Sequence, residues 1–309
     1  MINVYSVSTS CEKGVKKSNQ DFVMLKDNFG IECDAHGGFR HRQVSFLAIE
    51  SIRKMQKAGL DVTSGDFAEN ITTEGIDLCG LRVGDTLNIG DVAFIISQLG
   101  KVCHNKCSIY YQAGDCVMPK EGVFAIVKGS GKIKPGDKIT LSRKSELTSA
   151  VITLSDKGSR NERVDTTGPH IIDTIKKRLK ASFIRYDLIP DEKGELRSLL
   201  IDLSDTQKFD LIITNGSTGI SPRDIAPDVT EDVIDKKLPG FEEAMRSGSF
   251  EKTPHALISR AVCGVRNESF ILNLPGSPSG ARENLEIVLP AIPHAIKKLQ
   301  GDKTDCAKN

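Results

Sequence analysis

The sequence predicts two domains: a mainly β, barrel-like domain, followed by a three-layer α/β domain built on a doubly wound, mostly parallel sheet. The chain has 309 residues, about twice the length of a typical domain. Short β-branched runs separated by Gly-Asp turns dominate residues 1–143, whereas strands and helices alternate across residues 147–309. A polar stretch at residues 142–148 separates the two patterns and predicts a short linker.

Regular strands with few helices favour a compact barrel or folded sheet for the first half. Apolar residues at helical spacing predict one helix there, at residues 44–57. The predicted strands lie at residues 3–8, 22–25, 86–89, 93–98, 107–112, 122–127 and 138–141.

The alternating pattern of the second half is typical of a parallel sheet with helical crossovers, which binds ligands beyond the carboxyl ends of its strands. The predicted strands are residues 150–154, 183–188, 209–213 and 270–274. The predicted helices are residues 168–179, 195–203, 228–235, 242–246, 281–288 and 292–299.

Composition excludes several classes of protein. Hydrophobic residues make up 39% and charged residues 27%, which is typical of a globular protein. The net charge of +1 gives no support for binding nucleic acid. No apolar run approaches the roughly 20 residues of a membrane span, and the first residues lack the features of a signal peptide. We therefore expect a cytoplasmic protein without a membrane or nucleic-acid partner.

The stretch at residues 214–228, TNGSTGISPRDIAPD, follows a buried strand and precedes a helix. Glycines at such a turn let backbone N–H groups face a phosphate, and a neighbouring carboxylate can hold a divalent cation on that phosphate. Similar polar clusters follow the other strands, including Ser155-Asp156, Asp191 and Gly276. Together they predict a site for phosphoryl or nucleotidyl transfer with Mg²⁺. Taken singly, Ser155-Asp156 also fits a helix N-cap and Gly276 a simple turn.

Two common nucleotide-binding motifs are absent from the sequence. Without G-x-x-x-x-G-K-[S/T] the chain is not a P-loop ATPase, and without G-x-G-x-x-G a dinucleotide oxidoreductase is disfavoured.

The motifs of the second half, taken in order, resemble the molybdopterin adenylyltransferase family of molybdenum-cofactor biosynthesis. They read SDKGS, DTTGP, LIPD, TNGSTGISPRD, LPGFEE and LNLPGSP, across about residues 148–300. The core motif of that family usually reads T-G-G-T-G-x-x-x-R-D, and Asn215 and Ser217 depart from it. A Cβ at Ser217 would either enter the space where the backbone approaches a phosphate or require a positive φ.

The resemblance implies that ATP and molybdopterin bind in one crevice, where the terminal phosphate of molybdopterin attacks the α-phosphate of ATP. Adenylylated molybdopterin and pyrophosphate would result. Asp191 and Asp224 match the catalytic carboxylates of the family, which are expected to hold Mg²⁺. A homotrimer through the second domain is implied, and a molybdenum-insertion protein would take the product. The positions implied to bind the nucleotide, its phosphates or the pterin are Asp156, Gly216, Ser217, Thr218, Gly219, Arg223, Ser259, Asn273, Gly276 and Ser277.

Six of the eight cysteines lie before residue 120. In a reducing compartment such a cluster is catalytic, metal-binding or buried more often than disulfide-bonded. The surrounding motifs GIECDAHGG, RQVS and CVMPKEG resemble the MOSC domain, the C-terminal domain type of molybdenum-cofactor sulfurases, over about residues 1–142.

The MOSC resemblance implies a domain that binds the molybdenum cofactor through a cysteine that carries persulfide or contacts the metal. Cys107 matches that position best, with Cys103 and Cys116 as alternatives. Lys106 and His104 are suited to stabilise a thiolate there. His36 and Arg42 are suited to hold the pterin phosphate. The chain has no pyridoxal-phosphate desulfurase segment, so the sulfur would come from a separate donor protein.

Other interpretations remain open. Cys103, His104, Cys107 and Cys116 are close enough in sequence to chelate zinc, although paired C-x-x-C spacing is absent. Burial in the core is the interpretation we favour for Cys11, Cys79 and Cys263, and backbone contacts are an alternative role for His36 and His41. For the whole chain, the alternative to an enzyme is a non-catalytic carrier of molybdopterin or of the finished cofactor.

Overall fold

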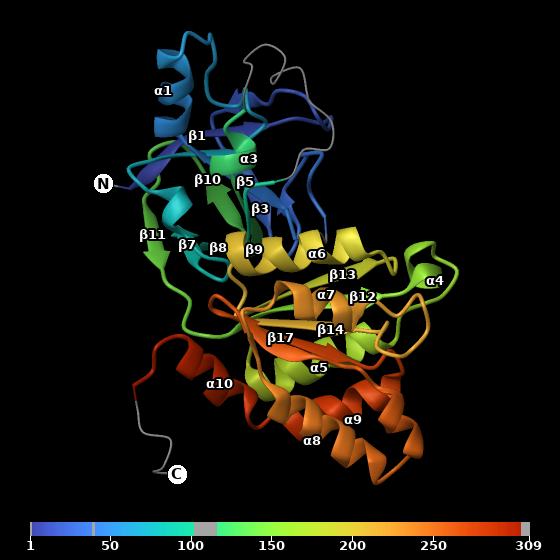
Figure 1. The fold of residues 1–309 in the computed structure, drawn as a ribbon. Coiled ribbons are helices and arrows are strands. Elements are labelled where there is room, and N and C mark those ends of the chain that lie inside the picture. Colours follow the sequence, from blue (N-terminus) through green and yellow to red (C-terminus); the bar gives the residue numbers. More distant parts are fainter. Residues whose placement is uncertain (1, 39–40, 102–115, 304–309) are drawn as a thin grey trace. The chain divides into compact units, whose positions relative to one another are not determined.

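The computed structural model describes residues 2–38, 41–101 and 116–303. The chain divides into two compact units, Met1–Ser145 and Glu146–Asn309 (Figure 1). The predicted two-domain class is confirmed, with a barrel-like β unit followed by an α/β unit. The predicted strand at residues 107–112 lies outside the described residues.

An eight-stranded sheet with the order β11-β7-β8-β9-β5-β6-β1-β2 forms most of the first unit. A three-stranded sheet with the order β10-β3-β4 accompanies it. The strands of the larger sheet are β1 (Asn3–Thr9), β2 (Ser18–Gln20), β5 (Val44–Ala48), β6 (Ile71–Glu74), β7 (Thr86–Ile89), β8 (Val92–Leu99), β9 (Val123–Lys128) and β11 (Ile139–Ser142). Those of the smaller sheet are β3 (Val23–Lys26), β4 (Gly30–Ile31) and β10 (Gly131–Ile133). The described helices are α1 (Ile49–Lys57), the 3₁₀ turn η1 (Leu78–Gly80) and α3 (Met118–Glu121).

The larger sheet curls until its two ends meet. The Val4 N–H donates to the Asp137 carbonyl oxygen at 2.9 Å, and the Ile139 N–H donates to the Ile2 carbonyl oxygen at 3.0 Å. The start of β1 therefore pairs with the region of β11, which protects backbone groups that an open edge would leave unpaired. Apolar side chains fill the interior, where the rings of Phe46 and Phe94 meet edge to face at 5.1 Å.

The predicted helix at residues 44–57 is wrong in its first third. Val44–Ala48 forms strand β5, and only Ile49–Lys57 is helical. Every residue of β5 is buried, and the strand pairs with β6 on one side and β9 on the other. A strand that is buried on both faces has no alternation of apolar and polar residues. The prediction therefore extended the helical spacing of the following residues back over this strand.

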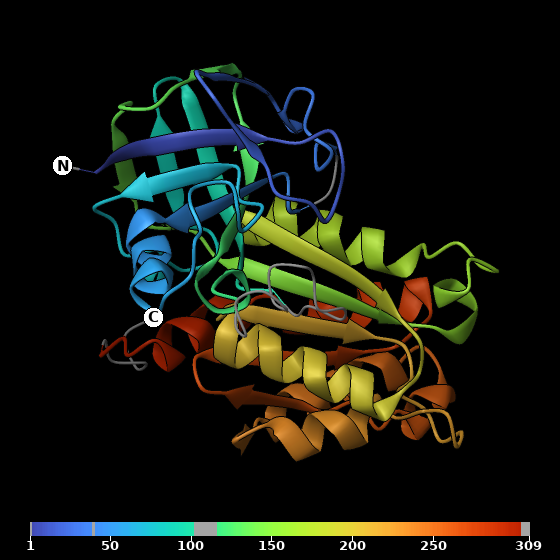
Figure 2. The same cartoon turned by 90° about the horizontal axis from the view of Figure 1, so that it is seen from above.

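The second unit has three layers. Its sheet has the order β13-β12-β14-β17-β16-β15. The first four strands are parallel, and β16 runs antiparallel to both of its neighbours, β17 and β15. Figure 1 shows α6 and α7 on one face and α5, α9 and α10 on the other, and Figure 2 shows the parallel strands from above. The strands are β12 (Thr148–Leu154), β13 (Phe183–Ile189), β14 (Leu211–Asn215), β15 (Lys236–Lys237), β16 (Cys263–Arg266) and β17 (Ser269–Leu274).

Most predicted helices of this unit begin and end within a few residues of the observed ones. The helices are α4 (Asp156–Ser159), α5 (Thr167–Leu179), α6 (Lys193–Ile201), α7 (Ala226–Val233), α8 (Pro239–Phe250), α9 (Pro278–Val288) and α10 (Ile292–Leu299). A π turn, η2 (Asp202–Thr206), follows α6, and a 3₁₀ turn, η3 (Pro254–Ile258), follows α8. Among the residues described, no helix combines the length and apolar character that crossing a membrane requires.

The strand order fixes where a ligand can bind. β13 lies on one side of β12 and β14 on the other, so the chain changes direction across the sheet at β12. At such a switch the loops after neighbouring strands turn to opposite faces and leave a crevice at the carboxyl edge.

Candidate functional site

A cavity of about 470 Å³ lies at the carboxyl edge of the second unit's sheet. The loops that follow β12, β13, β14 and β17 all contribute to it. The sequence-predicted residues that line it are Asp156, Asp191, Gly216, Ser217, Arg223, Asp224, Gly276 and Ser277. Strands far apart in the sequence thus bring most of the predicted nucleotide-binding set together.

Two of these loops interlock through Asp156 and Asp191. The Asp156 N–H donates to the Asp191 carboxylate at 3.0 Å, and the Asp191 N–H donates to the Asp156 carboxylate at 3.1 Å. Arg223 pairs with Asp156 at 2.7 Å and with Glu192 at 2.9 Å. Its hydrogen bonds hold the pKa of the Asp156 carboxyl below the usual range, whereas burial raises the pKa of Asp191.

Asp224 adds a third carboxylate, on the loop that follows β14. Its Oδ2 accepts a 2.7 Å hydrogen bond from the Ser221 N–H, so one oxygen holds the local turn. Among the described residues, no group of three or more His, Cys, Asp or Glu side chains is placed to hold a metal. Mg²⁺ in phosphate sites usually takes only one or two protein carboxylates and completes its shell with water and phosphate oxygens. Asp191 and Asp224 fit that donor set.

Two glycines bring backbone close together at the floor of the cavity. Gly216 has φ +96°, and a Cβ there would lie 2.5 Å from the Leu154 carbonyl oxygen. A Cβ on Gly276 would lie 3.1 Å from the Gly216 Cα. Both positions therefore require glycine for packing, and the turn leaves bare backbone facing the cavity.

Ser217 has a φ of +57°, which is the second of the two alternatives that its sequence position predicted. Its hydroxyl donates to the Arg223 carbonyl oxygen at 2.9 Å and accepts from the Ile225 N–H at 2.8 Å. The side chain therefore spans the loop between β14 and α7 and holds its two ends together, and these contacts offset the strain of the left-handed backbone.

We expect Ser217→Ala to destabilise the protein more than Ser217→Gly. Both variants lose the two hydroxyl hydrogen bonds, but only alanine keeps the strained φ, which costs about 1–2 kcal/mol relative to glycine. Thermal unfolding of the two variants beside the wild type measures the difference. Equal stability of the two variants would show that this strain is absent in solution.

Arg260 is a residue of the site that the sequence did not reveal. Its guanidinium donates to the carbonyl oxygens of Gly219 and Asp224, each at 2.8 Å, and to the Asp228 carboxylate at 2.7 Å. It therefore fixes both ends of the segment that carries Arg223. Its contact with Asp224 spans 36 residues and depends on the fold, although the neighbouring Ser259 was predicted as a site residue.

Asp165 is a second residue of the site whose role the sequence did not show. Its carboxylate accepts hydrogen bonds from the Thr153 and Tyr186 hydroxyls, each at 2.6 Å, and from the N–H groups of Thr167 and Gly168 at the start of α5. Burial raises its pKa, but these hydrogen bonds outweigh that effect, so the pKa of Asp165 lies below its usual range. The DTTGP motif begins with this residue and was a usable signal.

A second cavity, of about 300 Å³, adjoins the first through Ser277, which lines both. The predicted residues Thr218, Gly219 and Ser259 line this second cavity. Asn273 does not line either of them. Its side chain is buried, donates to the hydroxyls of Thr214 and Thr230, and accepts from the Val262 N–H, so it ties β17 to its neighbours.

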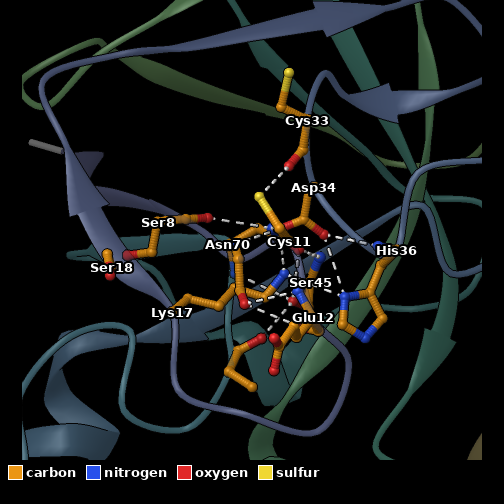
Figure 3. A network of polar contacts seen from close by, with 12 residues as sticks. Ser8, Cys11, Glu12, Lys17, Ser18, Cys33, Asp34, His36, Ser45 and Asn70 are labelled. Carbon is orange, nitrogen blue, oxygen red and sulfur yellow. Dashed lines mark hydrogen bonds and ion pairs between the residues drawn. The ribbon is translucent and has the colours of Figure 1, made fainter.

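In the first unit, His36 belongs to a buried polar network (Figure 3). Its Nδ1 lies 3.2 Å from the Asp34 carboxylate and 3.3 Å from the Lys17 Nζ. Lys17 and Asp34 form a fully buried ion pair at 2.6 Å. Burial raises the pKa of Asp34, but hydrogen bonds from His36 and Lys17 outweigh it, so that pKa falls well below the usual range. His36 is the exposed end of this network, with 37% of its side chain accessible.

Arg42, the other predicted ligand of the pterin phosphate, lies beside Gln98 and Phe124. Its Nε donates to the Gln98 side-chain oxygen at 2.8 Å, and its guanidinium lies 5.4 Å from the centroid of the Phe124 ring. His41 also contacts the Gln98 side chain, at 3.0 Å. The Gln98 side chain therefore contacts both His41 and Arg42, which are adjacent in the sequence.

The structure tests only some of the predictions made for the cysteines. Cys103, Cys107, His104 and Lys106 lie outside the described residues, so the structure gives no view of the predicted persulfide or zinc site. Cys116 and Cys263 are buried, as expected for Cys263. Burial was the wrong expectation for Cys11 and Cys79, which are both exposed, because each follows the end of a strand or lies in a turn rather than facing the core.

A parallel sheet whose carboxyl-edge loops combine close glycine backbone with carboxylates defines an α/β domain with a candidate ligand site at its topological switch point. Comparison with known proteins is more specific. The model of the family described as "Probable molybdopterin binding domain" matches residues 150–294, and that of the MOSC domain matches residues 33–140.

Three relatives illustrate the match. Gephyrin from Dictyostelium discoideum is 36% identical over 169 residues. The match covers 52% of this chain but only 23% of that longer relative. The solved structure of MoaB from Thermus thermophilus is 44% identical, covers 50% of this chain and 98% of its own, and has a TM-score of 0.47. A molybdopterin adenylyltransferase from Helicobacter pylori is 39% identical over 153 residues, which cover 49% of this chain and 87% of the relative. Because the chain matches most of the Helicobacter pylori relative at this identity, it belongs to the molybdopterin-binding domain family, and a MOSC domain precedes that domain.

Proposed function

We propose that the second unit adenylylates molybdopterin, using ATP as the donor and Mg²⁺ as the cofactor, in molybdenum-cofactor biosynthesis. The observation that carries the proposal is the pair of adjoining cavities that share Ser277. Transfer between two substrates needs two binding spaces with a common wall, where the reacting groups meet. The larger cavity has the loops suited to a triphosphate, and the adjoining one would take the pterin.

In this reaction an oxygen of the molybdopterin phosphate attacks the α-phosphorus of ATP. A new phosphoanhydride bond forms, and the bond to the leaving pyrophosphate breaks. Mg²⁺ would supply charge neutralisation of the phosphates, held by Asp191 and Asp224. The protein's own part is to position the phosphates, through the backbone around Gly216 and Gly276, and to keep both reactants in line.

Acidic side chains outnumber basic ones around the larger cavity, so a triphosphate there would need Mg²⁺ as well as the nearby cations to offset its charge. Asp156 and Glu192 neutralise the Arg223 guanidinium, so Arg223 holds loops together more than it attracts phosphate. Lys157 and Arg163 also line the cavity, and they are the side chains placed to offset the charge of a triphosphate.

The test is pyrophosphate release from ATP by the purified full chain, measured with and without molybdopterin and Mg²⁺. We expect release only when both are present. Binding of ATP and molybdopterin without pyrophosphate release would favour the alternative function, a carrier for molybdopterin or the finished cofactor.

For the first unit, we propose that it binds the maturing molybdenum cofactor, with His36 and Arg42 near the pterin phosphate and Cys107 as the sulfur-carrying residue. The MOSC match at residues 33–140 supports this proposal. Joining a cofactor-binding domain to the adenylylating one raises the local concentration of product for the next step. A homotrimer, cytoplasmic location, a sulfur donor protein and a molybdenum-insertion protein as partners stay predictions.

A further inference from the structure

Two exposed cysteines lie together on the first unit. The Cys11 Sγ is 3.8 Å from the Cys33 carbonyl oxygen, and both residues are exposed. Neighbouring backbone holds the two segments against each other. The Ala35 N–H donates to the Ser10 carbonyl oxygen at 2.8 Å, and the Ser10 N–H donates to the Asp34 carboxylate at 3.2 Å. Ser10, the residue before Cys11, is thus hydrogen-bonded to Asp34 and Ala35, the two residues after Cys33.

The backbone at Cys33 is one that a cysteine does not favour. Its φ is +63°, in the left-handed region that glycine adopts readily and side-chain-bearing residues avoid. The side chain is exposed and contributes nothing to the core. Strained residues of this kind concentrate at positions where the side chain has a function. The strained backbone and the exposed thiol together make Cys33 a candidate for a role beyond packing.

The segment that begins at Cys11 is exposed through residue 16 and ends at Lys17, which is buried. The Lys17 ammonium pairs with Asp34, the residue directly after Cys33, at 2.6 Å. The exposed segment is thus attached to the turn at Asp34 through Ser10 at one end and Lys17 at the other. A covalent bond between Cys11 and Cys33 would reinforce the first of these attachments, next to the exposed His36 (Figure 3).

We propose that Cys11 and Cys33 form a reversible redox pair, which a low-molecular-weight disulfide oxidises to an intramolecular disulfide. One cysteine thiolate attacks the small disulfide and forms a mixed disulfide, releasing one small thiol. The second thiolate then attacks the protein sulfur of that mixed disulfide and releases the second small thiol. The two cysteines are oxidised by two electrons, the small disulfide is reduced, and the two cysteine protons end on the released thiols.

Disulfide formation requires the Cys33 side chain to move. In Figure 3 the Cys33 thiol points away from Cys11, so the bond requires Cys33 to move to another staggered rotamer about its Cα–Cβ bond. Because the side chain is exposed, that rotation displaces no core packing. An exposed thiol next to a resolving cysteine is the arrangement typical of redox-sensing pairs, which form disulfides transiently in reducing compartments.

The experiment treats the reduced full-length chain with glutathione disulfide, alkylates the remaining thiols and maps the peptides by mass spectrometry. We expect a linked peptide pair that joins Cys11 to Cys33, with the loss of about 2 Da that one disulfide bond entails. Unfolding of the first unit should shift upward by roughly 5–10 °C, and dithiothreitol should reverse the shift.

Three variants make the assignment specific. Cys11→Ser and Cys33→Gly should each abolish the linked peptide and the thermal shift, and glycine at position 33 also suits the left-handed backbone, so that variant should fold. Cys79→Ser removes an exposed cysteine elsewhere on the unit and should leave both signals intact. Separate glutathione adducts on Cys11 and Cys33, or links from either to another cysteine, would overturn the proposal.

Discussion

Replacing Asp224 by asparagine should lower kcat/KM for molybdopterin adenylylation by about 100-fold or more while leaving the fold intact. The substitution removes a carboxylate proposed to hold Mg²⁺ against the ATP phosphates, and losses of this size are typical when charge stabilisation is removed from a transition state. The asparagine side-chain oxygen can still accept the hydrogen bond from the Ser221 N–H, which Asp224 accepts at 2.7 Å. The variant therefore separates the carboxylate charge from its structural contact.

The matched control is Asp173→Asn. Asp173 is an exposed residue of α5 that pairs with Lys177 one helical turn away, and exposed pairs of this kind contribute little to stability. Adenylylation by this variant should equal that of the wild type. If Asp224→Asn is folded and loses less than about threefold in kcat/KM, Asp224 is not a catalytic metal ligand.

Replacing Gly216 by alanine should destabilise the second unit by about 3 kcal/mol and abolish adenylylation. Two effects add at this position. The φ of +96° is strained for any residue with a Cβ, and that atom would lie 2.5 Å from the Leu154 carbonyl oxygen. The oxygen belongs to the backbone of central strand β12, so it cannot move aside as a flexible side chain would. The measurement is chemical denaturation combined with the pyrophosphate assay.

Gly194→Ala is the control for this prediction. Gly194 lies in helix α6, and a Cβ there would meet nothing within 4 Å. Alanine should raise helix stability by roughly 0.5–1 kcal/mol, because glycine has more freedom to lose on folding. Unfolding midpoints that fall for Gly216→Ala and rise or hold for Gly194→Ala would support the packing described here. A Gly216→Ala protein with wild-type stability would contradict it.

Much of the second unit could be predicted from sequence because its elements are locally encoded. Each parallel strand is a short apolar run that ends in a polar cluster, and each helix has a clear apolar period, as in α5 and α10. Strand β5 was missed because a segment buried on both faces has no period. The short strands β15 and β16 were missed because two to four residues give too little pattern.

The residues of the candidate site that could be predicted are those that follow the ends of predicted strands. Four of them, Asp156, Asp191, Gly216 and Gly276, lie within two residues of the end of a strand, at the carboxyl edge of the parallel sheet. The anchoring role of Arg260 depends on a contact across 36 residues, and no local pattern encodes such a contact. The structural role of the buried Asn273 side chain could not be predicted for the same reason, because its partners Thr214 and Thr230 lie on other elements.

The most direct test of the central claim is transfer of the AMP group itself. The full chain would be incubated with molybdopterin, Mg²⁺ and ATP labelled at the α-phosphate, and the pterin products separated. We predict that the label moves onto molybdopterin in equal amount to the pyrophosphate released, and that Asp224→Asn nearly eliminates both. Label that stays in ATP while both ligands bind tightly would contradict the account and identify the second unit as a carrier.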